Sequence, residues 1–301
     1  MGSYSPTPPP LEHGTVREGF GIEPEILPPG PQMPPRQAVR RPRSSWATAP
    51  ATYLLVGINC AVFLAMAARG LSIWAPTPDQ LMRWGANNAG SVLIYGEWWR
   101  IVTAMFVHVG ILHLATNMWC LWNLGLLAEP LMGSFGVLAV YILTGAAGNL
   151  LSTFSGWVLY GPDWVRFHTT PGFEMTAVFP AGAGASGAVF GIAGALIVLL
   201  KSNRLPLPPL ELKRLRKSVI YFAAINLVIG LATKIPGSPV IIDNMAHMGG
   251  CGCGLLFAAP MVPRLGSPRD LFQFRLRIAI GMVAGLLVLF GFYISHVQPP
   301  I

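Results

Sequence analysis

The peptide Gly184-Ala185-Ser186-Gly187 places a serine among glycines at the start of an apolar segment. A serine hydroxyl is a weak nucleophile until an adjacent base takes its proton. A later apolar segment contains His247, within Ala246-His247-Met248-Gly249-Gly250. An imidazole within reach of Ser186 would activate it for attack on a carbonyl group. The two residues together suggest nucleophilic catalysis, although neither peptide alone proves it.

Another apolar segment carries His113 and Asn117, four residues apart. On a helix this spacing puts both side chains on one face, where they can donate hydrogen bonds toward one point. Polar side chains in a membrane helix are costly and are candidates for function. His108 is five residues before His113, about 140° away from that face, so we expect it to have another role, such as bonding loop backbone.

Glycines accompany both candidate catalytic residues. They recur at three- and four-residue spacing at Gly184, Gly187, Gly191 and Gly194, and they follow His247 at Gly250 and Gly254. Small residues let helices approach closely, so the two segments are predicted to bring Ser186 and His247 to hydrogen-bond distance at matched depth. The competing interpretation is that the glycines only allow packing, while Ser186 bonds a carbonyl one turn back.

Asp243, four residues before His247, has two interpretations. It is either the third member of a triad or the cap of the helix that carries His247, and the capping role is the preferred expectation. Cys251 and Cys253 suggest a metal site only superficially, because no second ligand pair stands at usable spacing. No metal and no cofactor is expected.

The composition indicates a membrane protein. Of 301 residues, 53% are hydrophobic and 11% are charged, and the mean hydropathy is +0.55, which leaves too little polar surface for a soluble globule of this size. Seven apolar stretches are near the roughly 20 residues that a spanning helix needs. They are 51–68, 101–127, 131–156, 182–201, 218–235, 242–262 and 277–297.

The net charge of +8 does not indicate nucleic-acid binding, because no aromatic-laced basic patch or binding motif accompanies it. All but five of the 20 Lys and Arg residues lie in the N-terminal tail or in alternate loops. The five exceptions are Arg69, Arg83, Arg100, Arg166 and Lys234. The positive-inside rule therefore predicts a cytoplasmic N-terminus and an outer C-terminus.

Three parts are expected along the chain. Residues 1–50 hold 12 of the 28 prolines and are predicted to be a disordered cytoplasmic tail. Residues 51–262 would form a six-helix core, and 263–301 a cytoplasmic linker with a seventh helix. The aromatic-rich segment 69–100 is predicted to be an interfacial cap, with substrate contact as the alternative. Segment 157–181 is predicted to be a wet, mobile outer loop in which His168 is solvated.

The motifs from about residue 95 to 262 resemble the rhomboid family of intramembrane serine proteases. The matching elements are Trp99-Arg100, His108 followed by His113-x-x-x-Asn117, Gly184-Ala-Ser186-Gly187, and Ala246-His247-x-x-Gly250-x-x-x-Gly254. The resemblance implies an all-α polytopic fold of six helices plus one. It also implies Ser186 as nucleophile and His247 as general base, with an oxyanion hole formed by His113, Asn117 and the Ser186 backbone N–H.

In the same family an aromatic residue packs on the catalytic histidine, and Phe190 matches that position, where many members have tyrosine. By resemblance the protein is a serine endopeptidase that cleaves single-span membrane proteins in the bilayer. By the same resemblance, its substrates would have small residues at the cleavage site and helix-weakening residues beyond it. The bacterial inner membrane is the expected location. The alternatives are a non-proteolytic relative that binds membrane helices, and a transporter, for which no internal repeat is visible.

Overall fold

A computed structural model describes residues 48–161, 163–169, 172–202, 205, 207–233, 242–264 and 268–298. Most of the predicted N-terminal tail lies outside these residues. The elements are α1 (Pro50–Ala68), α2 (Pro78–Arg83), α3 (Ala89–Leu93), α4 (Arg100–Thr103), α5 (Ile111–Ser155), β1 (Asp163–Thr169), β2 (Gly172–Val178), α6 (Ser186–Leu199), α7 (Pro209–Ala232), α8 (Asn244–Ala258) and α9 (Arg269–Ser295). Short 3-10 turns cover Ala104–Phe106 and Ala259–Arg264, and a π-helical turn covers Gly156–Tyr160.

The fold is that of an all-α, multi-pass membrane protein, as predicted. Five helical segments in the described part of the chain are long and apolar enough to cross a membrane. One of them, Ile111–Leu159, has 49 residues and contains α5, which is broken at Gly133, where φ is 74°. This break separates the two spans predicted at 101–127 and 131–156. Helix α6 is a shorter apolar helix, and the total of seven spans stays a prediction.

The predicted start of the second span at residue 101 is wrong. Helix α4 ends at Thr103, the chain makes a 3-10 turn, and α5 begins only after Gly110. Gly110 has a φ of 138°, a conformation that favours glycine, and a Cβ added there would lie 2.5 Å from Trp74 O. His108 therefore lies in the connection before α5 and not on the helix that carries His113.

The predicted outer loop at 157–181 contains regular structure. Strands β1 and β2 pair antiparallel, from Asp163 opposite Val178 to Thr169 opposite Gly172. Apolar and polar residues alternate from Val165 to His168 and from Phe173 to Ala177, a strand signal that the loop prediction missed. The expectation for the His168 side chain lies outside what the structure describes.

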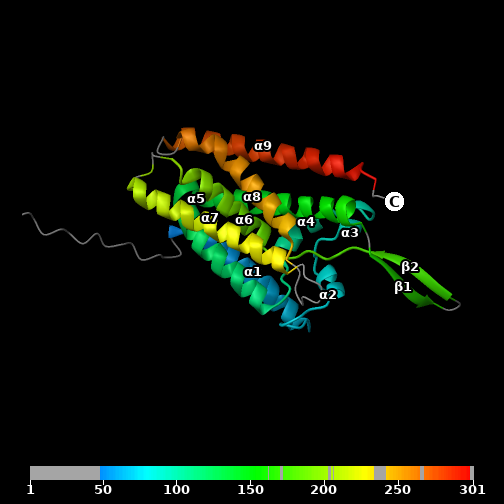
Figure 1. The fold of residues 1–301 in the computed structure, drawn as a ribbon. Helices are drawn as coiled ribbons and strands as arrows, with labels where there is room; N and C mark the ends of the chain where they lie inside the picture. Colours follow the sequence, from blue (N-terminus) through cyan, green and yellow to red (C-terminus); the bar gives the residue numbers. More distant parts are fainter. Residues whose placement is uncertain are drawn as a thin grey trace, which may run out of the picture. The chain divides into compact units, whose positions relative to one another are not determined.

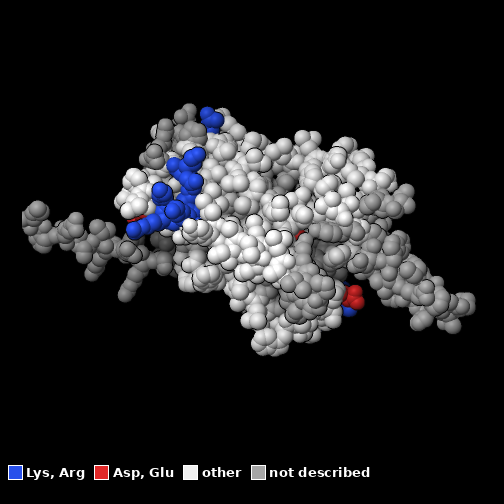
Figure 2. Space-filling model, in the orientation of Figure 1, with Lys and Arg blue, Asp and Glu red and all other residues white. Residues whose placement is uncertain are grey.

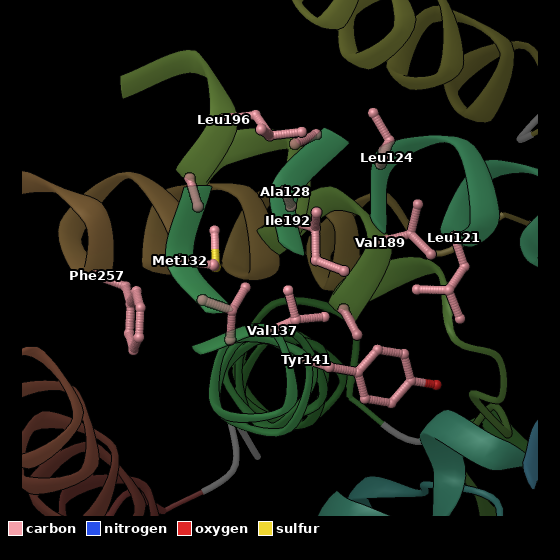
Figure 3. Close-up of a cluster of buried hydrophobic side chains, with 14 of the residues drawn as sticks. Leu121, Leu124, Ala128, Met132, Val137, Tyr141, Val189, Ile192, Leu196 and Phe257 are labelled. Carbon is pink, nitrogen blue, oxygen red and sulfur yellow. The ribbon is translucent and has the colours of Figure 1, made fainter. Parts of the chain in front are cut away.

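Helices α5, α6 and α8 pack most extensively on one another, while α1 packs on α5 (Figure 1). The buried core between them is almost wholly aliphatic (Figure 3). Both halves of α5 contribute to it, through Leu121 and Leu124 before the break and Val137 and Tyr141 after it, and Ile192 comes from α6. In lipid such contacts stabilise by close packing more than by removal of water. The core forms a rigid base below the first turns of α6 and α8.

Helix α1 is capped by an acid from another helix. Glu129 of α5 is 3% exposed, and its carboxylate accepts hydrogen bonds from Ala51 N and Thr52 N, both at 2.9 Å, and from Thr52 Oγ1 at 2.7 Å. The first N–H groups of a helix have no partner inside the helix and carry partial positive charge. A buried carboxylate there is therefore both hydrogen-bonded and electrostatically compensated.

Candidate active site

Ser186 is the first residue of α6 and is half-buried. The turn before it is fixed by two backbone donors: Gly184 N bonds Ala104 O at 2.9 Å and Ala185 N bonds His108 Nε2 at 3.4 Å. No side chain caps α6, so the first N–H groups of the helix, including that of Ser186, lack the partner they would find inside a helix. A helix end of this kind stabilises negative charge.

His108 thus bonds loop backbone on both sides, as predicted. Its Nε2 accepts from Ala185 N, so in the neutral ring its Nδ1–H donates to Phe106 O at 3.3 Å. The side chain is fully buried. It connects the turn before α5 to the turn before Ser186.

The glycines of α6 and α8 interlock, as the stripe predicted. A Cβ on Gly250 would collide with the carbonyl of Gly187, and a Cβ on Gly254 would collide with that of Gly191. Gly148 of α5 completes the junction: a Cβ there would lie 2.6 Å from Ala246 O. Three helix backbones therefore touch directly beside Ser186 and His247.

His247 is 5% exposed and is the fourth residue of α8. Its ring stacks on that of Phe190, with centroids 4.1 Å apart and an interplanar angle of 11°. Because Phe190 is one turn beyond Ser186, the stack holds the imidazole against the first turns of α6. The predicted hydrogen bond between Ser186 and His247 is not formed among the described residues; catalytic hydrogen bonds often tighten only when substrate is bound.

Asp243 is the N-cap of α8, which is the preferred of its two sequence interpretations. One carboxylate oxygen accepts from Ala246 N at 3.0 Å, and the other accepts from Ser152 Oγ of α5. Within the described part of the chain, His247 Nδ1 is buried without a hydrogen-bond partner. The carboxylate therefore accepts from the N-terminus of α8 and from Ser152. It does not contact the imidazole as a triad acid would.

His113 and Asn117 share a face of α5, as predicted. His113 Nδ1 accepts from Val109 N at 3.4 Å, which leaves the proton of the neutral ring on Nε2. That edge of the ring faces Gly184, where an added Cβ would lie 2.9 Å from Nε2. Asn117 uses Nδ2 to bond His113 O at 2.9 Å, and its second N–H remains. His113 thus keeps one donor beside the turn that leads to Ser186, and Asn117 lies one turn further along α5.

Arg100 connects several parts of the segment between α1 and α5. Arg100 is 8% exposed; it pairs with Glu97 at 2.6 Å and donates to Met82 O and Ala86 O. Its guanidinium lies 4.5 Å from the centre of a Trp99 ring. Leu81 and Ala86 of segment 69–100 form a small core with Met66 of α1 and Val107. The segment is therefore folded against its neighbours, while its place at the membrane interface stays a prediction.

The sequence analysis missed several residues that anchor the chain before Ser186 and the start of α8. Asn87 N and O both bond Gly182, at 2.7 and 2.8 Å, and so anchor the chain just before the Ser186 turn. Asn244 reaches from α8 to α7, and Ser152 meets Asp243. The polarity of Ser152 within an apolar stretch was a signal, whereas nothing near Asn87 marked its partner.

Residues 95–264 match the sequence profile of the family described as Rhomboid domain. The chain belongs to the rhomboid family. It is similar to Rhomboid protease GluP of Bacillus subtilis (strain 168), at 32% identity over 81% of this chain and 40% of the relative. It is also similar to Rhomboid protease AarA of Providencia stuartii, at 31% identity over 75% of this chain and 78% of the relative.

A plant protein is similar as well. RHOMBOID-like protein 6, mitochondrial, of Arabidopsis thaliana is 31% identical over 64% of this chain and 53% of its own length. This rhomboid chain therefore spans less than half of GluP and about half of the plant protein, but most of AarA. The shared segment contains all the candidate site residues.

Proposed function

We propose that this rhomboid is an intramembrane serine endopeptidase in which Ser186 is the nucleophile and His247 the general base. The observation that carries the proposal is the stack of Phe190 on His247 at 4.1 Å. Ser186 and Phe190 lie on successive turns of α6, and the glycines of α6 and α8 bring the two helix backbones into direct contact. The relatives named rhomboid proteases support the same reaction class.

The reaction follows from the placement of donors and base. Ser186 Oγ attacks the carbonyl carbon of a peptide bond while His247 Nε2 takes the hydroxyl proton. The carbonyl oxygen becomes an oxyanion beside the Ser186 N–H, His113 Nε2–H and Asn117 Nδ2. When the C–N bond breaks, His247 returns the proton to the leaving amine. Water then hydrolyses the acyl-enzyme by the same steps.

The oxyanion donors are neutral and held before substrate arrives. His113 is oriented by Val109 N and Asn117 by the carbonyl of His113, so little reorganisation is needed as charge develops. Removal of one donor of this kind typically lowers the rate by about 10²- to 10³-fold. No step requires a metal or a cofactor.

We infer that the substrates are single-span membrane proteins cut in or next to their transmembrane helix, near the outer face. Exposed basic side chains gather over the start of α7 (Figure 2), where Lys213, Arg214 and Lys217 lie. Ser186 and His247 lie on the first turns of the helices that α7 flanks, near its far end, where Asn244 bonds Leu227 O. By the positive-inside rule the basic end faces the cytoplasm, which puts the site toward the outside of a bacterial inner membrane.

The test is cleavage of a fluorogenic single-span reporter by the purified protein in liposomes. Wild type is expected to cut, while Ser186→Ala and His247→Ala are expected to be inactive although folded. If wild type binds several reporters with small residues at the cleavage site but cuts none, the proposal is wrong and the protein is a non-proteolytic binder of membrane helices.

A further inference from the structure

The first turn of α8 is held from two sides. On one side Asp243 accepts from Ser152 Oγ of α5 and caps its own helix through Ala246 N. On the other side Asn244 Nδ2 donates to Leu227 O of α7 at 3.1 Å. These two adjacent residues tie one helix turn to two different helices.

The α7 side is shaped to receive the Asn244 side chain. Asn244 is 6% exposed, and its amide lies against Gly230, where any Cβ would collide with it. Its Oδ1 is buried without a conventional hydrogen-bond partner and stands next to the Gly230 Cα, a contact typical of weak Cα–H···O bonds. Thr233, at the end of α7, adds a hydroxyl that accepts from Ile242 N at 3.0 Å.

The α5 side lies next to the chain that leads to Ser186. A Cβ on Gly182 would be 3.6 Å from Asp243 Oδ2 and 3.8 Å from Ser152 Oγ. Gly182 is the residue that pairs with Asn87. The hydrogen bond between Asp243 and Ser152 is thus packed against the anchored segment four residues before the nucleophile.

His247 follows the two tied residues by one turn, and its backbone N bonds Asp243 O at 3.2 Å. Its own Nδ1 has no partner in the described structure, so no hydrogen bond donated to a carboxylate orients the ring. Orientation must come from the stack on Phe190 and from the position of the helix turn that carries the ring.

We propose that Asp243, Ser152 and Asn244 form a clamp that positions the general base, so that the carboxylate acts on His247 through the helix and not through the imidazole. All three are positioning residues, and the inference rests on the proposed protease function. A shift of about 1 Å in a catalytic group can cost on the order of 10²-fold in rate. Loss of one side of the clamp should therefore lower Ser186 reactivity by roughly 10- to 100-fold.

The experiment measures the rate at which a fluorophosphonate probe labels Ser186 in liposomes, since this rate reports nucleophile activation without needing a substrate helix. Ser152→Ala and Asn244→Ala are expected to label about 10- to 100-fold more slowly than wild type, with reduced kcat and unchanged KM on the reporter. Ser152→Thr restores the hydroxyl and should recover most of the rate. Ser155→Ala is the matched control, because among the described residues Ser155 Oγ bonds only Ser152 O of its own helix.

Thermal unfolding is measured on every variant, because a purely structural role would lower the melting temperature and leave labelling at low temperature unchanged. If Ser152→Ala does not fold, Asn244→Ala carries the same test. Labelling of folded variants at the rate of Ser155→Ala would overturn the clamp and leave the proposed function standing. Wild type that labels no faster than Ser186→Ala would overturn the proposed function, and the clamp with it.

Discussion

Three glycines of α8 offer a graded test of how closely this helix approaches α5 and α6. A Cβ added at Gly252 meets nothing within 4 Å. At Gly249 it would lie 2.8 Å from Ala147 O and 2.9 Å from Leu151 Cβ, and at Gly250 it would collide with the carbonyl of Gly187 more severely still. All three changes to alanine give the same gain in helix propensity, so differences between them report the contacts.

The size of each effect follows from the displacement needed. Ordinary contact begins at 3.4 Å, so Gly249→Ala requires a movement of about 0.6 Å and should lower kcat on the order of 10-fold. Gly250→Ala requires more and should lower kcat by about 10²-fold or beyond, with a loss of about 1–3 kcal/mol in stability from overpacking. Gly252→Ala should keep wild-type activity.

Reporter cleavage in liposomes, with thermal unfolding of the same preparations, measures both quantities. The expected order of activity is Gly252→Ala, then Gly249→Ala, then Gly250→Ala. Equal activity of all three variants would refute the view that close contact of α8 with α5 and α6 sets the geometry of the proposed site. A loss in Gly252→Ala as large as that in Gly250→Ala would refute it as well.

Three further outcomes are expected. Glu129→Gln should lower stability by about 2 kcal/mol, because the charged hydrogen bonds that Glu129 accepts from Thr52 and the start of α1 are weakened. Fluorophosphonate labelling should stay unchanged, and unaltered thermal unfolding would contradict this prediction. Phe190→Leu should lower kcat by about 5-fold through loss of roughly 1 kcal/mol of stacking on His247, whereas Phe190→Tyr should not; equal kcat values would oppose it. Arg100→Lys should lower the melting temperature, since an ammonium cannot reproduce the guanidinium fork, and an unshifted melting curve would count against that role.

The sequence was sufficient for the parts of the fold that depend on local pattern. Apolar length located the long apolar helices except for the start of α5. The spacing of Gly187 and Gly191 against Gly250 and Gly254 indicated which helix faces touch. Asp243 was recognisable as a cap because it stands directly before a helical stretch. These inferences need only residue types and a helical period.

Other features depend on contacts between distant parts of the chain. The bond of Ser152 to Asp243 joins residues 91 apart, and the bond of Asn87 to Thr153 joins residues 66 apart; no local pattern specifies either partner. The late start of α5 was missed because residues 101–107 are as apolar as a helix, and only Gly110 signals the break. The short helix α2 had a visible signal in its capping box, Thr77 with Gln80.

The paired backbone hydrogen bonds between Asn87 and Gly182 separate the β1–β2 hairpin from Ser186. A pull or twist applied to the hairpin is resisted at Gly182 before it reaches the Ser186 turn. A segment accepts inserted sequence more readily when the backbone that follows it is independently anchored. The hairpin is therefore a suitable place to attach a tag, a dye or a tether for force measurements while the Ser186 turn stays undisturbed.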